Sequence, residues 1–330
     1  TAVGKGSLDT NTEGTRNIAV GGEALGANTT ASFNNALGYK ALCSNTTGAS
    51  NISIGTCSMR INTTGANNVA VGDKALCANT TGVNSVAVGC GALISNTEGG
   101  CNVAVGRISL QDNTTGANNI AIGASALQSN TTASDNIAIG KSALTATLTG
   151  CRNVAIGSNA LIANTANNNV AVGFCALRTN SSGADNTAMG RLALTLNTTG
   201  SCNVAVGQNS LHTNTEGSCN TAIGRQASYN NTTADHNTSV GYNALFTNTT
   251  GHSNTAVGKE ALLLNTTGNC NVAIGVEAMD SNTTGSNNVG IGTDSLQGNT
   301  EGSNNISIGD DTMKTNSTGD YNTAVGKAAL

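Results

Sequence analysis

Ten cysteines are the first candidates for chemistry in this chain of 330 residues, because thiols form disulfides and bind metal ions. Cys202 and Cys219 lie 17 residues apart, one period of the repeat described below. Stacked residues one coil apart are within disulfide range, whereas Cys43 and Cys77 are two periods apart and cannot pair in a straight stack. No CxxC motif occurs, so no zinc site is indicated. Free thiols in turns, a Cys202–Cys219 disulfide and interchain bridges are the three interpretations.

Histidines and carboxylates show no catalytic pattern. His212, His236 and His252 each occupy a different place in the repeat, so they form no column and no metal-ligand spacing. The 18 acidic residues are scattered, and the GGxGxDxUx calcium-binding repeat is missing. A polysaccharide-processing solenoid enzyme needs clustered carboxylates and aromatic residues, and only 2% of this chain is aromatic. We therefore expect no enzyme activity, no metal site and no cofactor.

The element that positions these side chains is a short repeat whose clearest copy is NVAVGDKAL, Asn68 to Leu76. Its glycine recurs with 18 intervals of 17 residues and one of 16, at positions 4, 21, 38, 55, 72, 89, 106, 123, 140, 157, 173, 190, 207, 224, 241, 258, 275, 292, 309 and 326. So strict a period predicts an all-β, parallel β-solenoid of about 20 coils. Positions below are counted from this glycine as zero.

Composition agrees with a thin, stacked core. The chain has 38% apolar residues, 42 glycines, no tryptophan and no proline, which suits a narrow seam rather than a globular centre. The net charge of −4 and the scattered basic residues argue against nucleic-acid binding. No apolar run has the length of a membrane span, and no signal peptide is present. We expect no membrane contact in this segment.

Two apolar columns are predicted to form the core. Position −1 is Val or Ile in nearly every coil, position −2 is small, and position +4 is mostly Leu. Because side chains alternate along a strand, −1 and −2 face opposite ways. We expect two short strands per coil, with −1 inside against +4 and −2 outside against a close neighbour. The predicted core residues are Val71, Val105, Ile122, Ile139, Ile156 and Val206 at −1, and Leu76, Leu110, Leu127, Leu144 and Leu161 at +4.

Asparagine is the most persistent polar residue. At position −4 we expect amide side chains to bond to one another along the stack. Members of this predicted ladder are Asn17, Asn51, Asn68, Asn102, Asn119, Asn136, Asn153, Asn203, Asn271 and Asn322. The outer loop reads NTTG, a turn sequence that also matches the N-glycosylation acceptor. The acceptor candidates are Asn28, Asn45, Asn62, Asn79, Asn113, Asn197, Asn248, Asn265 and Asn282, although turn chemistry alone explains each of them.

Residues 1–330 read as one continuous repeat array. Two loops depart from the pattern: Thr147-Leu148 replaces Asn-Thr, and the stretch 164–169 is one residue short. The chain begins within a repeat at Thr1 and ends directly after an Ala-Leu pair, with no polar cap visible at either end. We expect it to be a section of a longer polypeptide.

NVAVGDKAL and its copies NIAIGASAL (Asn119 to Leu127) and NVAIGSNAL (Asn153 to Leu161) resemble the head repeats of YadA-like trimeric autotransporter adhesins and related phage and viral fibre proteins. The resemblance covers essentially the whole chain, and the NTTG loop is longer than the connection in that family. It implies a left-handed parallel β-roll, three chains per head, and a place on the surface of a bacterium or virion.

The resulting expectation is a structural fibre or stalk segment of an extracellular adhesin, displaying loops for attachment to an unknown receptor or matrix. Its partner would be itself, as a homotrimer or a longer filament. Stacking also favours assembly, because a single thin coil buries little apolar surface. A phage or viral tail or receptor-binding fibre is one alternative. An ice-binding solenoid is another, suggested by the threonine at +8 in successive coils, as in Thr12, Thr29, Thr46 and Thr63.

Overall fold

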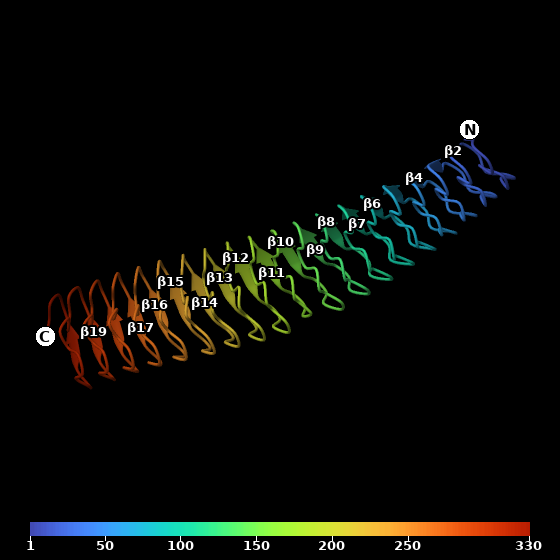
Figure 1. Cartoon of the computed structure of the whole chain (residues 1–330). Coiled ribbons are helices and arrows are strands. Elements are labelled where there is room, and N and C mark those ends of the chain that lie inside the picture. The colour runs from blue at the N-terminus through green and yellow to red at the C-terminus, as the bar shows by residue number, and fades with distance from the viewer. The chain divides into compact units, whose positions relative to one another are not determined.

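The computed structural model describes residues 1–330, with twenty short β-strands and no helix (Figure 1). The chain divides into two compact units, Thr1–Asn167 and Asn168–Leu330. Unit 1 contains β1 (Ala2–Val3), β2 (Ile18–Val20), β3 (Asn35–Leu37), β4 (Ile52–Ile54), β5 (Val69–Val71), β6 (Val86–Val88), β7 (Val103–Val105), β8 (Ile120–Ile122), β9 (Ile137–Ile139) and β10 (Val154–Ile156). Unit 2 contains β11 (Val170–Val172), β12 (Thr187–Met189), β13 (Val204–Val206), β14 (Thr221–Ile223), β15 (Thr238–Val240), β16 (Thr255–Val257), β17 (Val272–Ile274), β18 (Val289–Ile291), β19 (Ile306–Ile308) and β20 (Thr323–Val325). The structure contains no helix with the length and apolar character needed to cross a membrane.

Within each unit, every strand pairs in parallel with the next strand of the chain. In unit 1, Val69 of β5 lies opposite Val86 of β6, which in turn lies opposite Val103 of β7. In unit 2, Thr255 of β16 lies opposite Val272 of β17. Each partner is 17 residues away, so equivalent positions stack in columns. The predicted parallel β-solenoid with a 17-residue repeat is confirmed for both units.

A glycine turn ends each strand. Gly89 has φ = +133°, and a Cβ atom built there would lie 2.5 Å from the carbonyl oxygen of Gly106 in the next coil. Side chains are excluded from such contacts, and φ near +130° is not accessible to L residues without strain. The repeating glycine is therefore required by both the backbone angle and the close stacking of coils.

The second wall of each coil is a run of turns, so the prediction of a second strand was wrong. Lys74 and Leu76 have left-handed φ angles of 54° and 51°. The Ala75 N–H donates to the Gly72 carbonyl at 3.3 Å, closing a turn, while the Leu76 N–H donates to Ala92 of the next coil at 2.9 Å. A left-handed leucine costs about 1–2 kcal/mol. Full burial of its side chain contributes about 1.5–3 kcal/mol, which offsets that strain.

The core lies between the strand wall and this second wall, and it differs from the prediction on one side. The leucines at +4 (Leu76, Leu110, Leu127, Leu144 and Leu161) are fully buried, as expected. The residues at −1 face outward: Val105, Ile122 and Ile156 are 36%, 39% and 38% exposed, and Val71, Ile139 and Val206 are partly exposed. The alanine at −2 points inward instead and is fully buried in most coils.

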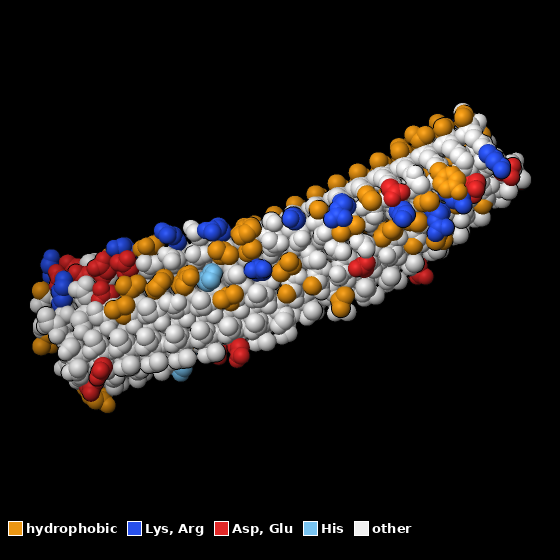
Figure 2. All heavy atoms as spheres, in the orientation of Figure 1, with side chains coloured by type: hydrophobic (Ala, Val, Ile, Leu, Met, Phe, Trp, Pro, Cys, Tyr) orange, Lys and Arg blue, Asp and Glu red, His pale blue; other side chains and the backbone are white.

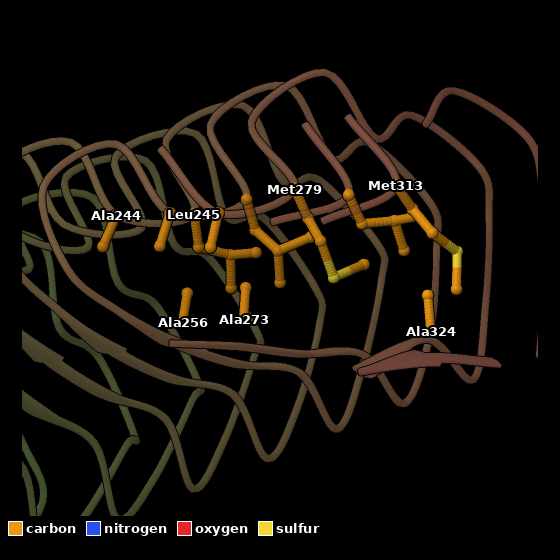
Figure 3. Packing of buried hydrophobic residues seen from close by; sticks show 11 residues of the cluster. Ala244, Leu245, Ala256, Ala273, Met279, Met313 and Ala324 are labelled. Carbon is orange, nitrogen blue, oxygen red and sulfur yellow. The ribbon is translucent and has the colours of Figure 1, made fainter. Parts of the chain in front are cut away.

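The narrowness of the coil explains this reversal. Figure 3 shows Ala256, Ala273 and Ala324 of the strand wall facing Leu245, Met279 and Met313 of the opposite wall. The gap between the walls holds an alanine against a leucine, so an inward Val or Ile would overfill it. Small residues at −2 are required by the interior of the chain, not by an external neighbour.

Serines that replace a strand-wall alanine at −2 are paired with a serine of the opposite wall, whereas Ser109 and Ser210 bond the carbonyl of their own turn. Ser53 lies 2.6 Å from Ser58, the Ser228 hydroxyl donates to Ser239 at 2.8 Å, and the Ser295 hydroxyl donates to Ser307 at 2.8 Å. Because an unpaired buried hydroxyl is costly, a serine at one wall is stabilised by a serine at the other. The departure from leucine at Ser228 is explained by this pairing.

Candidate functional site

The most extensive functional candidate is the outward face of the strand wall, formed by the first and third residue of each strand. We call it the valine–isoleucine face. In unit 1 its members include Ile18, Leu37, Ile52, Ile54, Val105, Ile122 and Ile156, and in unit 2 they include Met189, Ile223, Ile274, Ile306 and Ile308, all 36–50% exposed. Figure 2 shows hydrophobic side chains gathered in rows that run from coil to coil. Contiguous exposed apolar surface of this kind is typical of an interaction site.

The asparagines at −4 join neighbouring coils through the backbone. The Asn119 N–H donates to the Oδ1 atom of Asn102 at 2.9 Å, and the Asn119 Nδ2 atom donates to the Ala133 carbonyl at 2.9 Å. Direct amide contacts occur in places, as from Asn153 to Asn136 at 3.2 Å. Asn17 is 6% exposed, the ladder members from Asn51 to Asn271 are fully buried, and Asn322 is partly buried. This column is thus a backbone clamp, and the amide-to-amide ladder predicted here is only partly formed.

In unit 1 an amide ladder is formed instead by the asparagine of the outer loop, at +7, and it runs from Asn11 to Asn130. Asn45 donates from Nδ2 to Oδ1 of Asn28 at 3.0 Å, Asn62 to Asn45 at 2.8 Å, and Asn79 to Asn62 at 2.7 Å. The nine residues considered as glycosylation acceptors all belong to this column and are fully buried. Their Nδ2 atoms also donate to a loop carbonyl, as from Asn62 to Gly65. The folded chain therefore excludes a glycan at these positions, and the glycosylation hypothesis is wrong for the folded state.

The +7 ladder of unit 1 is interrupted at Thr147. Asn130 accepts no hydrogen bond at its buried Oδ1 atom, because the next coil presents a threonine that bonds the Asn164 carbonyl. An unpaired buried acceptor costs about 1–3 kcal/mol. The cost arises from the replacement of one residue in an otherwise regular column.

We predict that Thr147→Asn stabilises unit 1 by about 1 kcal/mol, because the new amide can donate to Asn130. Thermal or urea unfolding of the variant measures the gain. The matched control is Leu148→Thr, which restores the repeat at an adjacent, 49% exposed position and should change stability by less than about 0.5 kcal/mol. A Thr147→Asn protein less stable than the parent would contradict the ladder interpretation.

The threonines at +8 are engaged with the backbone. The Oγ1 atom of Thr29 donates to the Thr46 carbonyl at 3.2 Å, and that of Thr46 donates to the Thr63 carbonyl at 3.1 Å. Their hydroxyl protons are directed along the stack. This geometry weakens the interpretation of the threonine column as an ice-binding surface.

The cysteines are free thiols, and one pair is brought together. Cys202 and Cys219 are exposed on adjacent coils of unit 2, with the Cys219 N–H donating to the Ser201 carbonyl at 3.0 Å. In the same column, His236 lies one coil after Cys219, and Asp185 lies one coil before Cys202. This shared position is not visible when the three histidines are compared only with one another, because His236 shares its column with cysteines and an aspartate. No group of three or more His, Cys, Asp or Glu side chains converges on one point.

A column of carboxylates is present at position +2 of unit 2. The prediction that the acidic residues are scattered was therefore wrong for this part of the chain. Glu260, Glu277, Asp294 and Asp311 occupy successive coils. Lys259 bonds Glu260 and Glu277 at 3.1 Å each, and Lys314 bonds Asp294 and Asp311 at 2.8 Å each. The hydrogen bond from Lys314 lowers the pKa of Asp311. Because these ion pairs are largely exposed, each contributes little to stability.

Aromatic residues form one short stack at position +5 of unit 2. His212 and Tyr229 lie with ring centroids 5.0 Å apart, and Tyr229 and Phe246 lie 5.3 Å apart. Burial lowers the pKa of His212, which favours the neutral ring. The ring contacts of His212, Tyr229 and Phe246 along the stack support a packing role for these residues.

Comparison with protein-family models and with curated proteins finds no match to this chain.

Proposed function

We propose that this chain is a structural segment of an extracellular surface fibre, assembled with sister copies of itself through the valine–isoleucine face. The observation that carries the proposal is the position of the apolar residues on the strand wall: position −1 places an apolar side chain on the outside of every coil, and position −3 adds a second one in most coils, with Thr1, Asn35 and threonine in five coils of unit 2 as the exceptions. The resemblance to YadA-like heads supports a homotrimer and a location on a bacterial cell or virion.

The repeat explains why such assembly would be strong. Covering the exposed half of one Val or Ile side chain contributes on the order of 1 kcal/mol. Each unit has ten strands, so the contribution accumulates along the face. Association entropy is lost only once per chain, and a long repeating interface therefore gains stability with every added coil.

The columns on the other sides suit display. Residues at +1 and +2 vary in type, from Tyr39 to Asp73 and Lys74, and they are exposed or partly exposed except at Gly91 and Cys175. Such positions change without disturbing the buried Ala–Leu core, so they are the natural contacts for a receptor or matrix in adhesion. A phage or viral receptor-binding fibre would use the same surface, and a longer filament would add end-to-end contacts.

The test is the mass of the full chain in solution, by light scattering or sedimentation. We expect three times the chain mass for the parent protein. Lysines at Ile122 and Ile156, which are exposed and two coils apart, should reduce the mass to that of one chain while the far-UV circular dichroism is retained.

The control carries lysines at Thr81 and Thr115, which are exposed in the outer loops of the same unit. Its mass should equal that of the parent. A parent chain that is a stable monomer at micromolar concentration would refute the assembly proposal. In that case thermal hysteresis of the monomer would support the ice-binding alternative, with the threonine column at +8 as the proposed surface, and its absence would remove that alternative.

A further inference from the structure

One column of unit 2, at position −5, places two thiols on neighbouring coils. Asp185, Cys202, Cys219 and His236 occupy four successive coils and have almost identical φ angles of 58°, 59°, 58° and 59°. The Cys202 N–H donates to Ala184 at 3.0 Å and the His236 N–H donates to Ser218 at 3.1 Å, which fixes the coils in register. The four side chains therefore leave the backbone in the same direction, and all four are exposed.

The spacing of the two thiols does not favour a disulfide. Residues related by one coil are separated by about 4.8 Å, and equal backbone angles give their Cβ atoms the same separation. A disulfide requires Cβ atoms about 3.5–4.5 Å apart, so the coils would have to tilt toward each other. A metal ion between the two sulfur atoms holds them much farther apart than the S–S bond of about 2.05 Å, so it does not require the coils to approach each other.

We propose that Cys202 and Cys219 bind one soft monovalent d10 cation, Cu(I) or Ag(I), between their sulfur atoms in a linear two-coordinate site. Thiolate sulfur is the ligand type that such cations prefer. Binding replaces two S–H protons by one cation, so two protons are released and the site gains one negative charge. No redox step is involved.

The neighbours of the pair predict how this site responds to charge. Asp185 occupies the same column one coil before Cys202, so its carboxylate lies beside the site, which is anionic when the cation is bound. Asp185→Asn should strengthen binding by removing this repulsive charge.

The experiment uses the full chain, reduced and kept without oxygen, with Ag(I) as the probe. An excess monothiol competitor removes ions from single cysteines, and native mass spectrometry counts the ions that remain. We expect one retained Ag(I) per parent chain. Retention should be about 100-fold weaker in Cys202→Ser or Cys219→Ser, because two thiols on one chain bind the same ion with a high effective concentration.

The matched control is the Cys101→Ser, Cys270→Ser double variant. These cysteines occupy the same column, but their neighbours in it are Asn and Ser, so neither has a thiol beside it. The control should retain one ion. Retention that is unchanged in Cys202→Ser, or no retention by the parent, would overturn the proposal. So would a Cys202–Cys219 disulfide on exposure to air, detected as a loss of two hydrogens, since that bond requires a closer approach than the coil spacing.

Discussion

Gly89→Ala is expected to destabilise unit 1 by at least about 3 kcal/mol, because it adds strain at φ = +133° and a steric clash at the same atom. The new Cβ atom would lie 2.5 Å from the Gly106 oxygen and 2.7 Å from its carbonyl carbon. Both are backbone atoms of the next coil, so no side-chain rotation relieves the contact. Urea unfolding measures the loss, and hydrogen exchange should show that β6 and β7 separate first.

Gly91→Ala is the matched control, two residues away in the same turn. Gly91 has φ = +67°, and its Cβ atom would meet only the Ile108 side chain, at 3.3 Å. Other coils place Lys40, Cys57 and Lys74 at this position with φ of 54–56°. We expect a loss of no more than about 1 kcal/mol. Equal losses in the two variants would show that the spacing of coils does not determine the need for glycine at position zero.

The period and register of the fold could be predicted from the sequence, but the inside of the coil could not. Alternation along VAV shows that −1 and −2 face opposite ways, yet it does not say which way is inward. Hydrophobicity favoured the valines, whereas the available volume selects the alanines. The inward direction is indicated by substitutions that occur together across the coil, eleven residues apart. Ser228 at +4 occurs with Ser239 at −2, and Met279 at +4 occurs with Gly290 at −2. A Cβ atom at Gly290 would lie 2.7 Å from the Met279 side chain, so the two positions face each other.

The candidate sites show a similar division. Adjacent positions for Cys202 and Cys219 followed from the period alone, and His236 could have been added by comparing residue types within one column. The burial of the loop asparagines could not be predicted, because a turn asparagine such as Asn62 satisfies the same local pattern whether its amide points to solvent or inward. Only the closed coil shows that this amide meets Asn45 in the stack.

Asn119→Ala is expected to cost about 3 kcal/mol, since it removes two buried hydrogen bonds at once. The Asn119 Oδ1 atom accepts the Asn136 N–H at 3.0 Å, and its Nδ2 atom donates to the Ala133 carbonyl at 2.9 Å. Asn136 and Ala133 are themselves buried, so water cannot replace the amide. The loss should be seen as a lower midpoint of urea unfolding.

Serine at the same position should cost about half as much, because one of the two bonds can be kept. Ser85 already stands at this place in the repeat, where it accepts the Asn102 N–H at 3.2 Å and donates to Val83 at 3.3 Å. Asn118→Ser is the control: this neighbour is exposed, and its column holds serine at Ser50 and Ser253. We expect Asn119→Ala to be the least stable variant, Asn119→Ser to be intermediate, and the Asn118→Ser control to be the most stable. If Asn119→Ala unfolds at the same urea concentration as Asn118→Ser, the −4 amides do not hold the coils together, and their burial has another cause.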